Sequence, residues 1–228
     1  MKVAIDGPAG AGKSTVAKAV AQGRGFVYLD TGAMYRSVAL LALEGDVDLA
    51  DEAALAAIAE SIELAFVPAA DGGQRVLVAG RDVTSEIRTP RVDAAVSSVS
   101  SVPAVRASMV ELQRKLAGSA DVVAEGRDIG TVVFPDAEVK VFLTADAHAR
   151  AHRRSVQNTQ RFGADADEAC EEDIYRRIVE RDRADSTRAT APLVAAEDAV
   201  HIDSSSLGVA EVVRLVEDLI DAAQAQEA

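Results

Sequence analysis

The sequence predicts an α/β fold with a central parallel sheet. Short apolar runs that read as strands alternate with helical patterns along most of the chain, which is typical of a parallel sheet with crossover helices. A glycine-rich loop joins the first strand to the first helix, and one pair of apolar runs forms a hairpin pattern. With 228 residues the chain is long enough for one such domain with insertions.

The first elements alternate strictly between strand and helix. Val3–Asp6 is an apolar strand, and a helix begins at about Lys13 after the glycine-rich loop. Phe26–Asp30 is a second short strand, and Thr31–Arg36 opens a second helix. This order predicts that the chain enters a parallel sheet from its first residues.

Beyond Gly45 the pattern changes. Asp51–Ser61 is rich in alanine and helical in character. Leu64–Val67 and Arg75–Val78 flank a Gly72-Gly73 turn, so we expect an antiparallel hairpin there. A hairpin inside an alternating α/β pattern indicates an inserted subdomain.

The second half returns to the alternating pattern and ends in an amphipathic helix. The predicted elements are helices at Pro90–Ser100 and Pro103–Leu116, strands at Val122–Glu125, Val139–Leu143 and Val200–Asp203, and a closing helix at Leu207–Ala223.

The glycine-rich loop fits the phosphate-loop pattern G-x-x-x-x-G-K-[ST] at every constrained position. In such a loop the backbone N–H groups and the positive end of the following helix bind phosphate, Lys13 reaches the terminal phosphates and the Ser14 hydroxyl holds Mg²⁺. This predicts a nucleoside triphosphate site without identifying the reaction. The residues expected to bind the nucleotide are Gly7, Pro8, Ala9, Gly10, Ala11, Gly12, Lys13, Ser14 and Thr15.

The segment from Ala149 to Arg188 is rich in arginine, although the whole chain carries a net charge of −13. Arg181, Asp185 and Arg188 share one helix face if the helix continues, and Gln160–Asp165 reads as a loop. One interpretation is a solvated helix surface. The other is a lid whose arginines close over a transferring phosphoryl group.

A third cluster, Glu125-Gly126-Arg127-Asp128, follows a predicted strand. Ligands of open α/β sheets bind beyond the carboxyl ends of the strands, so this cluster is expected beside the phosphate loop. Glu125 is a candidate for ordering Mg²⁺, and Arg127 and Asp128 are expected to face the acceptor.

Composition excludes several other classes of protein. An acidic chain is not expected to bind nucleic acid polymers or anionic membranes, and no apolar stretch is long enough for a membrane span. Strand residues follow Met1-Lys2 directly, which leaves no room for a signal peptide, and Cys170 is the single cysteine. These features predict a cytoplasmic protein. His148 and His152 lie four residues apart but have no further ligands that would make a zinc site.

Several longer motifs together resemble the bacterial cytidylate kinases. They are Gly7–Thr15, Leu29–Arg36, Glu86–Thr89, Gly126–Asp136 and Arg188–Leu193. The resemblance implies a three-layer α/β/α P-loop fold with a central parallel sheet, a helical lid and an inserted monophosphate-binding subdomain with a small antiparallel sheet. The implied boundaries are a core at about 1–56, 99–150 and 189–228, an insert at about 57–98 and a lid at about 151–188.

The same resemblance implies a reaction in which ATP phosphorylates CMP or dCMP, with Mg²⁺ as cofactor and the protein as a monomer. It assigns catalysis to Lys13, Arg127, Arg181 and Arg188. It assigns base recognition to Ser97, Arg106 and Asp128. It assigns binding of the acceptor and its phosphate to Tyr35, Arg36, Arg127 and Arg188. Arg181 and Asp185 are expected to contact the pentose, and Thr31 and Gly126 are expected to make further substrate contacts. The adenine pocket is expected near Arg154 and Ser204–Ser206. Thr31, Glu125 and Ser14 depart from the commoner Ser, Asp and Gly of the family.

Three alternatives to this reaction remain. A GTP-hydrolysing switch would read guanine through an Asn-Lys-x-Asp segment, but the single asparagine, Asn158, is followed by Thr159. A kinase for a hydroxyl acceptor would need a carboxylate base, for which Asp30 or Asp128 is available. A nucleotide-binding module without catalysis would not need the arginine-rich segment. Within the favoured class, UMP stays open as an alternative acceptor, because spacing does not distinguish it from CMP.

Overall fold

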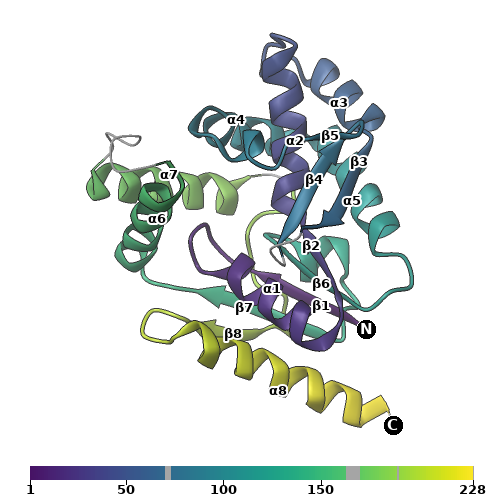
Figure 1. Ribbon diagram of the computed structural model, residues 1–228, viewed down its shortest axis with the longest axis vertical. Helices are drawn as coiled ribbons and strands as arrows, with labels where there is room; N and C mark the ends of the chain where they lie inside the picture. The colour runs from purple at the N-terminus through teal and green to yellow at the C-terminus, as the bar shows by residue number, and fades with distance from the viewer. Residues whose placement is uncertain (70–72, 163–169, 189, 228) are drawn as a thin grey trace. The chain divides into compact units, whose positions relative to one another are not determined.

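The computed structural model describes residues 1–69, 73–162, 170–188 and 190–227. The chain packs as two compact units (Figure 1). Unit 1 comprises Met1–Leu29 and Ala117–Ala228, and unit 2 comprises Asp30–Leu116.

The main sheet has five strands in the order β2-β6-β1-β7-β8. β1 pairs in parallel with β6 and with β7, and β7 pairs in parallel with β8. Val3, Ala4 and Ile5 of the central strand are fully buried, as expected for a parallel strand covered on both faces. The strands are β1 Lys2–Asp6, β2 Val27–Asp30, β6 Val122–Gly126, β7 Val139–Thr144 and β8 Val200–Asp203.

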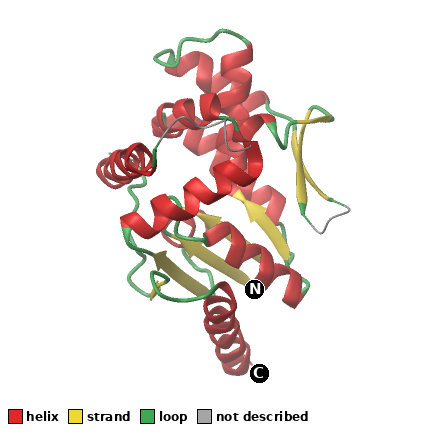
Figure 2. Ribbon diagram, turned by 60° about the vertical axis from the view of Figure 1, so that its left-hand side comes forward, coloured by secondary structure: helices red, strands yellow, loops and turns green. Residues whose placement is uncertain are grey.

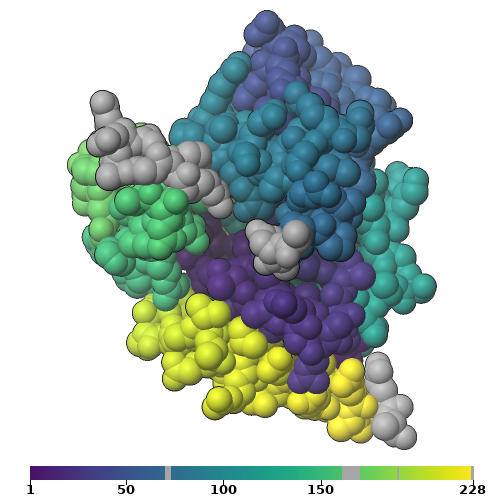
Figure 3. Space-filling model, viewed as in Figure 1, coloured from purple at the N-terminus to yellow at the C-terminus, as the bar shows by residue number. Residues whose placement is uncertain are grey.

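Two helices of unit 1 cover this sheet with apolar side chains. Val16 and Val20 of α1 and Val216 and Ile220 of α8 join the buried side chains of β1 and β7 in one core cluster. Figure 3 shows the surface of α8, in yellow, directly beside that of the N-terminal segment, in purple. The helical segments of unit 1 are α1 Lys13–Arg24, α6 Ala147–Phe162, α7 Glu171–Thr187, α8 Val209–Glu227 and a π-helical turn at Ile129–Val133.

Unit 2 consists of helices and a small antiparallel sheet in the order β3-β4-β5. Figure 2 draws the strands of both sheets in yellow and the helices in red. Phe66 lies opposite Val76 in the hairpin, and Leu77 lies opposite Asp82. The elements are α2 Thr31–Glu44, α3 Glu52–Ser61, β3 Leu64–Pro68, β4 Gln74–Val78, β5 Arg81–Asp82, a 3₁₀ turn at Glu86–Arg88, α4 Pro90–Ser101 and α5 Pro103–Ala117.

Local sequence explains where the helices of unit 2 begin. The side chain of Asp30 accepts a hydrogen bond from the Ala33 amide at 2.9 Å, and that of Asp51 accepts one from the Ala54 amide at 3.0 Å. Each carboxylate satisfies an amide that the first turn of a helix leaves without a partner. Pro90 opens α4, a position where its fixed φ suits the helix and its missing N–H costs nothing.

The structure confirms the predicted α/β class, its parallel sheet and the hairpin. Gly72 of the predicted turn lies outside the described residues. Three local features differ from the expectation: β5 extends the hairpin to a third strand, Ile129–Val133 forms a π-helical turn, and Gln160–Phe162 belongs to α6 although Gln160–Asp165 reads as a loop. The rest of that segment lies outside the described residues. Within the described part of the chain, no helix combines the length and apolar character that a membrane crossing requires.

Candidate active site

The phosphate loop is held by side chains that bind its carbonyl oxygens. Arg127 donates to the Gly7 carbonyl at 3.0 Å, Arg150 to the Ala9 carbonyl at 3.0 Å, and Ser204 to the Ala11 carbonyl at 3.1 Å. In a trans peptide the N–H points away from the C=O of the same peptide unit. The amides that follow Ala9 and Ala11 therefore point away from these side chains, which suits a backbone site for an anion.

Gly7 is required at the start of this loop. Its φ is +147°, and a Cβ placed there would lie 2.0 Å from the backbone oxygen of Leu143 in β7. No side chain fits that space, so the loop can leave β1 only through glycine. At the other end Gly12 stands at the N-cap of α1 and has no side chain to occupy the positive end of the helix.

Lys13 lies buried at the first position of α1, with 6 % of its surface exposed. Its Nζ donates to the Pro8 carbonyl of the loop at 2.8 Å. Burial and, after it, the charge of Arg127 lower the pKa of Lys13 to about 7, although Glu125 and Asp6 raise it. The ammonium group is therefore held in a position where a bound anion would stabilise its charge.

Glu125, the residue before the last of β6, is a buried carboxylate close enough to influence Lys13. The hydroxyl of Tyr28, on β2, donates a hydrogen bond to its Oε1. The Lys18 ammonium group lies over the Tyr28 ring, with its Nζ 5.6 Å from the ring centroid. The tyrosine thus fixes one oxygen of the Glu125 carboxylate.

Three of the predicted arginines surround one carboxylate, Asp185 of α7. Arg127 donates through Nε to Asp185 at 2.8 Å, and Arg188 lies 3.7 Å from its other oxygen. Arg181 interacts electrostatically with both Asp185 and Lys13. Burial raises the pKa of Asp185, but the three arginines outweigh it and hold the pKa below its ordinary value.

This cluster therefore joins the phosphate loop, because Arg127 binds both Asp185 and the Gly7 carbonyl. Gly126 and Asp128 flank Arg127, and Asp128 is buried. Ser14 and Thr15 lie exposed at the start of α1. The described residues of unit 1 thus bring together the loop, Lys13 and the predicted arginines.

α6 and α7 pack as a helix pair. Ala151, Ile174 and Ile178 form a small core between them, and the His148 ring stacks on Tyr175 at 4.3 Å. Arg150 of α6 binds Asp182 of α7 at 2.6 Å and also the loop carbonyl of Ala9. The pair is thereby attached to the phosphate loop by a buried arginine.

The remaining predicted substrate residues lie in unit 2. Arg106 is buried, donates to the Ser100 carbonyl at 3.2 Å and lies 5.4 Å from the centroid of the Tyr35 ring. Arg36 forms an ion pair with Asp93 and donates to the Ile87 carbonyl. Thr31 is buried at the start of α2, and Ser97 is half-buried on α4. The residues assigned to the acceptor therefore divide between the two units.

Sequence reasoning did not assign a role to Tyr28 or Arg150. Arg150 was visible as one of many arginines in its segment, but nothing local distinguished it from the exposed ones. The region expected for adenine shows a related feature, since Arg153 donates to both the hydroxyl and the carbonyl of Ser204. Ser204 itself supports the loop rather than standing free for a ligand.

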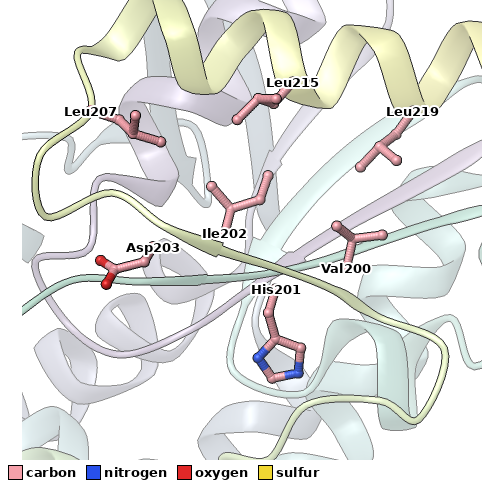
Figure 4. A pocket seen from close by; sticks show the side chains of 7 residues that line it. All are labelled: Val200, His201, Ile202, Asp203, Leu207, Leu215 and Leu219. Atoms are coloured by element: carbon pink, nitrogen blue, oxygen red, sulfur yellow. The ribbon is translucent and has the colours of Figure 1, made fainter.

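An apolar hollow of about 290 Å³ lies elsewhere, between β8 and α8 (Figure 4). Leu207, Leu215 and Leu219 face Val200 and Ile202 across it, whereas the His201 ring lies on the other side of the strand. The residues that line it are mostly apolar and include no lysine or arginine, so the hollow does not suit a phosphate group.

Comparisons with known proteins agree with this geometry. A family model described as cytidylate kinase matches residues 3–222. The chain is 52% identical over 214 residues to the cytidylate kinase of Pelotomaculum thermopropionicum, covering 94% of this chain and 93% of the relative. It is 48% identical over 220 residues to that of Carboxydothermus hydrogenoformans, covering 96% and 97%. A solved shikimate kinase from Acinetobacter baumannii in complex with shikimate superposes with a TM-score of 0.46 and 13% identity over 97% of this chain and 93% of that one, a likeness too weak to bear on the acceptor. The chain belongs to the cytidylate kinase family.

Proposed function

We propose that this protein transfers the γ-phosphoryl group of ATP to CMP or dCMP, giving ADP and CDP or dCDP. The observation that carries the proposal is the position of Arg127, which binds the phosphate loop at Gly7 and the arginine-rich helix α7 at Asp185. Together with membership of the cytidylate kinase family, this favours phosphoryl transfer over simple nucleotide binding.

The phosphate loop and Lys13 are proposed to bind the donor. Polyphosphate in the loop would accept hydrogen bonds from its amides, and Lys13 would exchange the Pro8 carbonyl for a phosphate oxygen. Since burial lowers the pKa of Lys13 to about 7, an anion beside it raises that pKa and restores the full charge. The lysine then neutralises charge that develops during transfer.

The acceptor needs positioning more than a base. The oxygen of a nucleoside monophosphate is already anionic near neutral pH, so no proton has to be removed before it attacks the γ-phosphorus. Arg127, Arg181 and Arg188 are proposed to bring the two phosphate groups together and to neutralise the charge between them. Asp185 keeps these arginines in place.

For the nucleoside part of CMP the proposal follows the family. Ser97, Arg106 and Asp128 are proposed to read cytosine, while Tyr35 and Arg36 join Arg127 and Arg188 in holding the acceptor. Arg181 and Asp185 are proposed to contact the pentose, and Thr31 and Gly126 complete the set. The Tyr35 ring beside the Arg106 guanidinium supports a shared role for these two residues.

Mg²⁺ is proposed as a cofactor held by Ser14 together with ATP phosphates and water, with Glu125 in the surrounding shell. The described residues contain no group of three or more His, Cys, Asp or Glu side chains arranged for a metal. The exposed Ser14 hydroxyl and the buried Glu125 carboxylate offer oxygen donors, which fits Mg²⁺ bound mainly through substrate oxygens, because this ion takes only one or two protein oxygens in such sites. When bound, the ion neutralises charge on the transferring phosphate.

The region at about 151–188 is proposed as a lid and that at about 57–98 as the monophosphate-binding insert. A lid on α6 and α7 would carry Arg181 toward and away from bound nucleotides. We propose further that the protein acts in the cytoplasm as a monomer, and size-exclusion chromatography with light scattering tests the oligomeric state.

The test is a coupled assay of ADP release with ATP and each of CMP, dCMP, UMP, AMP and GMP. We expect the highest kcat/KM for CMP and dCMP. A higher kcat/KM for UMP than for CMP would favour the alternative in which UMP is the acceptor. Activity with AMP or GMP but not with CMP would reject the base assignment, and ATP hydrolysis that no monophosphate increases would reject the transfer reaction.

A further inference from the structure

Asp6 is a buried acid at the junction between β1 and the phosphate loop, with 5 % of its surface exposed. Its Oδ1 accepts a hydrogen bond from the Ile129 amide at 2.8 Å and its Oδ2 one from the Gly130 amide at 2.7 Å. Both amides belong to the first residues of the π-helical turn. That turn follows Arg127 and Asp128 directly in the chain.

The segment from Gly126 to Gly130 is therefore attached to β1 and the loop at several points. Gly126 lies opposite Asp6 in the parallel register of β6 and β1. Arg127 donates to the carbonyl of Gly7, the residue after Asp6. Contacts with Asp6 and Gly7 thus hold the chain on both sides of Arg127 and Asp128.

The packing around this attachment leaves little freedom. A Cβ added at Gly130 would lie 3.2 Å from Cδ of Lys140 and 3.5 Å from Oδ2 of Asp6. Lys140 is itself held by Asp198 at 2.7 Å. The tighter of these two contacts is the one with Lys140, so a side chain at position 130 would press on that lysine.

A carboxylate suits this position better than an amide. Both oxygens of an ionised carboxylate accept hydrogen bonds, whereas an asparagine offers one acceptor and turns its NH₂ group toward the second amide. Burial and, to a smaller extent, the charge of Asp128 raise the pKa of Asp6 to about 6, although the two amides and Lys13 lower it. The group is therefore mostly ionised at neutral pH.

We propose that Asp6 is a positioning residue for the acceptor side of the reaction. It holds the turn after β6 so that Arg127 and Asp128 stand at a set place relative to the phosphate loop. This inference rests on the proposed function, because Arg127 and Asp128 matter only if they bind the acceptor. It concerns the acceptor more than ATP, since the amides that Asp6 binds lie outside the loop.

The test compares Asp6→Asn with the wild type in steady-state kinetics with CMP, UMP and ATP. A displacement of about 1 Å at a reacting group costs up to roughly 100-fold in rate, so we expect kcat/KM for CMP to fall between about 10-fold and 100-fold. We also expect the preference for CMP over UMP to shrink, because Asp128 moves with the turn. The KM for ATP should stay near that of the wild type.

Two further variants separate positioning from other effects. Ile5 lies on the same strand as Asp6 and is fully buried. The substitution Ile5→Val loosens the core without changing a contact of the turn, so it should lower Tm but leave the CMP kinetics unchanged. Gly130→Ala keeps the charge of Asp6 and its influence on Lys13, yet crowds the Lys140 side chain that packs against the turn. It should reproduce the loss of CMP preference to a smaller extent.

The outcomes are distinguishable. A wild type without CMP kinase activity refutes the proposed function itself. If the wild type is active, normal CMP kinetics in Asp6→Asn refute the inference, as does an equal rise of KM for ATP and CMP. A defect in Asp6→Asn that leaves the preference for CMP over UMP unchanged assigns the effect to charge on Lys13 and also refutes the inference. If Asp6→Asn does not fold, the CMP preference of Gly130→Ala decides.

Discussion

At the scale of single residues, Lys13 shows how function opposes stability. Its ammonium group is almost completely buried next to Arg127 and Arg181, and burial lowers its pKa to about 7. The folded protein therefore binds this proton less tightly than the unfolded chain does. Such a group destabilises the folded state at neutral pH and is retained for what it binds.

We predict that Lys13→Met stabilises the protein and abolishes activity. The free energy of unfolding at pH 7 should rise by on the order of 1–3 kcal/mol, because the variant no longer buries a charge. The gain should shrink as pH approaches 10, where the lysine is neutral in the folded state and loses little on burial. Urea unfolding at several pH values measures it.

The same variant should lose activity by at least about 100-fold, as expected for a group that stabilises developing charge. Lys115→Met on the exposed surface of α5 is the matched control and should change neither property. Full activity of Lys13→Met would remove the proposed phosphate site. A lower stability at pH 7 would contradict the account of its pKa.

Arg106→Met tests base recognition. Arg106 lies buried beside Tyr35 in unit 2, so its loss should weaken CMP use without reaching the donor site. We predict a rise in KM for CMP of at least about tenfold, the cost of one lost charged hydrogen bond, with little change for ATP. Steady-state kinetics with each nucleotide varied in turn measure both values, and an equal loss for the two nucleotides would argue against a base-reading role.

The residues that sequence reasoning found and missed differ in a simple way. Gly7 to Ser14 could be proposed as a phosphate site from sequence because eight adjacent residues supply the chemistry and the spacing. Asp6, Tyr28 and Arg150 could not, because each acts through a contact with a residue far along the chain. The Asp6 bonds, for example, span 123 and 124 positions.

At the scale of elements, helix α7 is held in place by charges rather than by a large apolar surface. Ile174 and Ile178 are its buried apolar side chains among the described residues, whereas Asp185 binds Arg127 and approaches Arg188. An element attached in this way responds to charge. Phosphate groups that compete for Arg127 would weaken the attachment that α7 makes through Asp185.

We predict that Asp185→Asn destabilises the protein in a pH-dependent way. The arginines hold the pKa of Asp185 below its ordinary value of 3.8, so its stabilising effect is present above that pH and is lost as the pH falls. At pH 7 the variant should lose on the order of 1–3 kcal/mol, since the half-buried arginines lose a charged hydrogen-bond acceptor. Chemical denaturation at pH 7 and at about pH 3 should show the difference from wild type narrowing in acid. A difference that stays constant or widens in acid would contradict this assignment.

The elements themselves were largely predictable. Val3–Asp6 and Val139–Leu143 are apolar runs whose burial in a parallel sheet follows from composition. The π-helical turn at Ile129–Val133 was not predictable, because its first amides bind a carboxylate from another strand rather than obeying a local pattern. β5 has only two residues, too few for a periodic signal.

At the scale of the whole molecule, the residues assigned to donor and acceptor divide between the two compact units. The loop, Arg127 and Arg188 belong to unit 1, and Tyr35, Arg36 and Arg106 belong to unit 2. If ATP and CMP meet end to end, each nucleotide should bind more weakly alone than a molecule that carries both. The central claim is that donor and acceptor phosphates occupy one continuous site.

The most direct test is calorimetric binding of a bisubstrate molecule in which cytidine and adenosine are joined through their 5′ positions by five phosphates. Because linking converts the second binding step into an intramolecular one, it should bind with one-to-one stoichiometry and at least about 100-fold more tightly than ATP alone. ATP and CMP should each displace it, and Arg127→Met should remove most of the gain. An affinity equal to that of ATP alone would contradict the account, because the cytidine end would then have no place beside the donor.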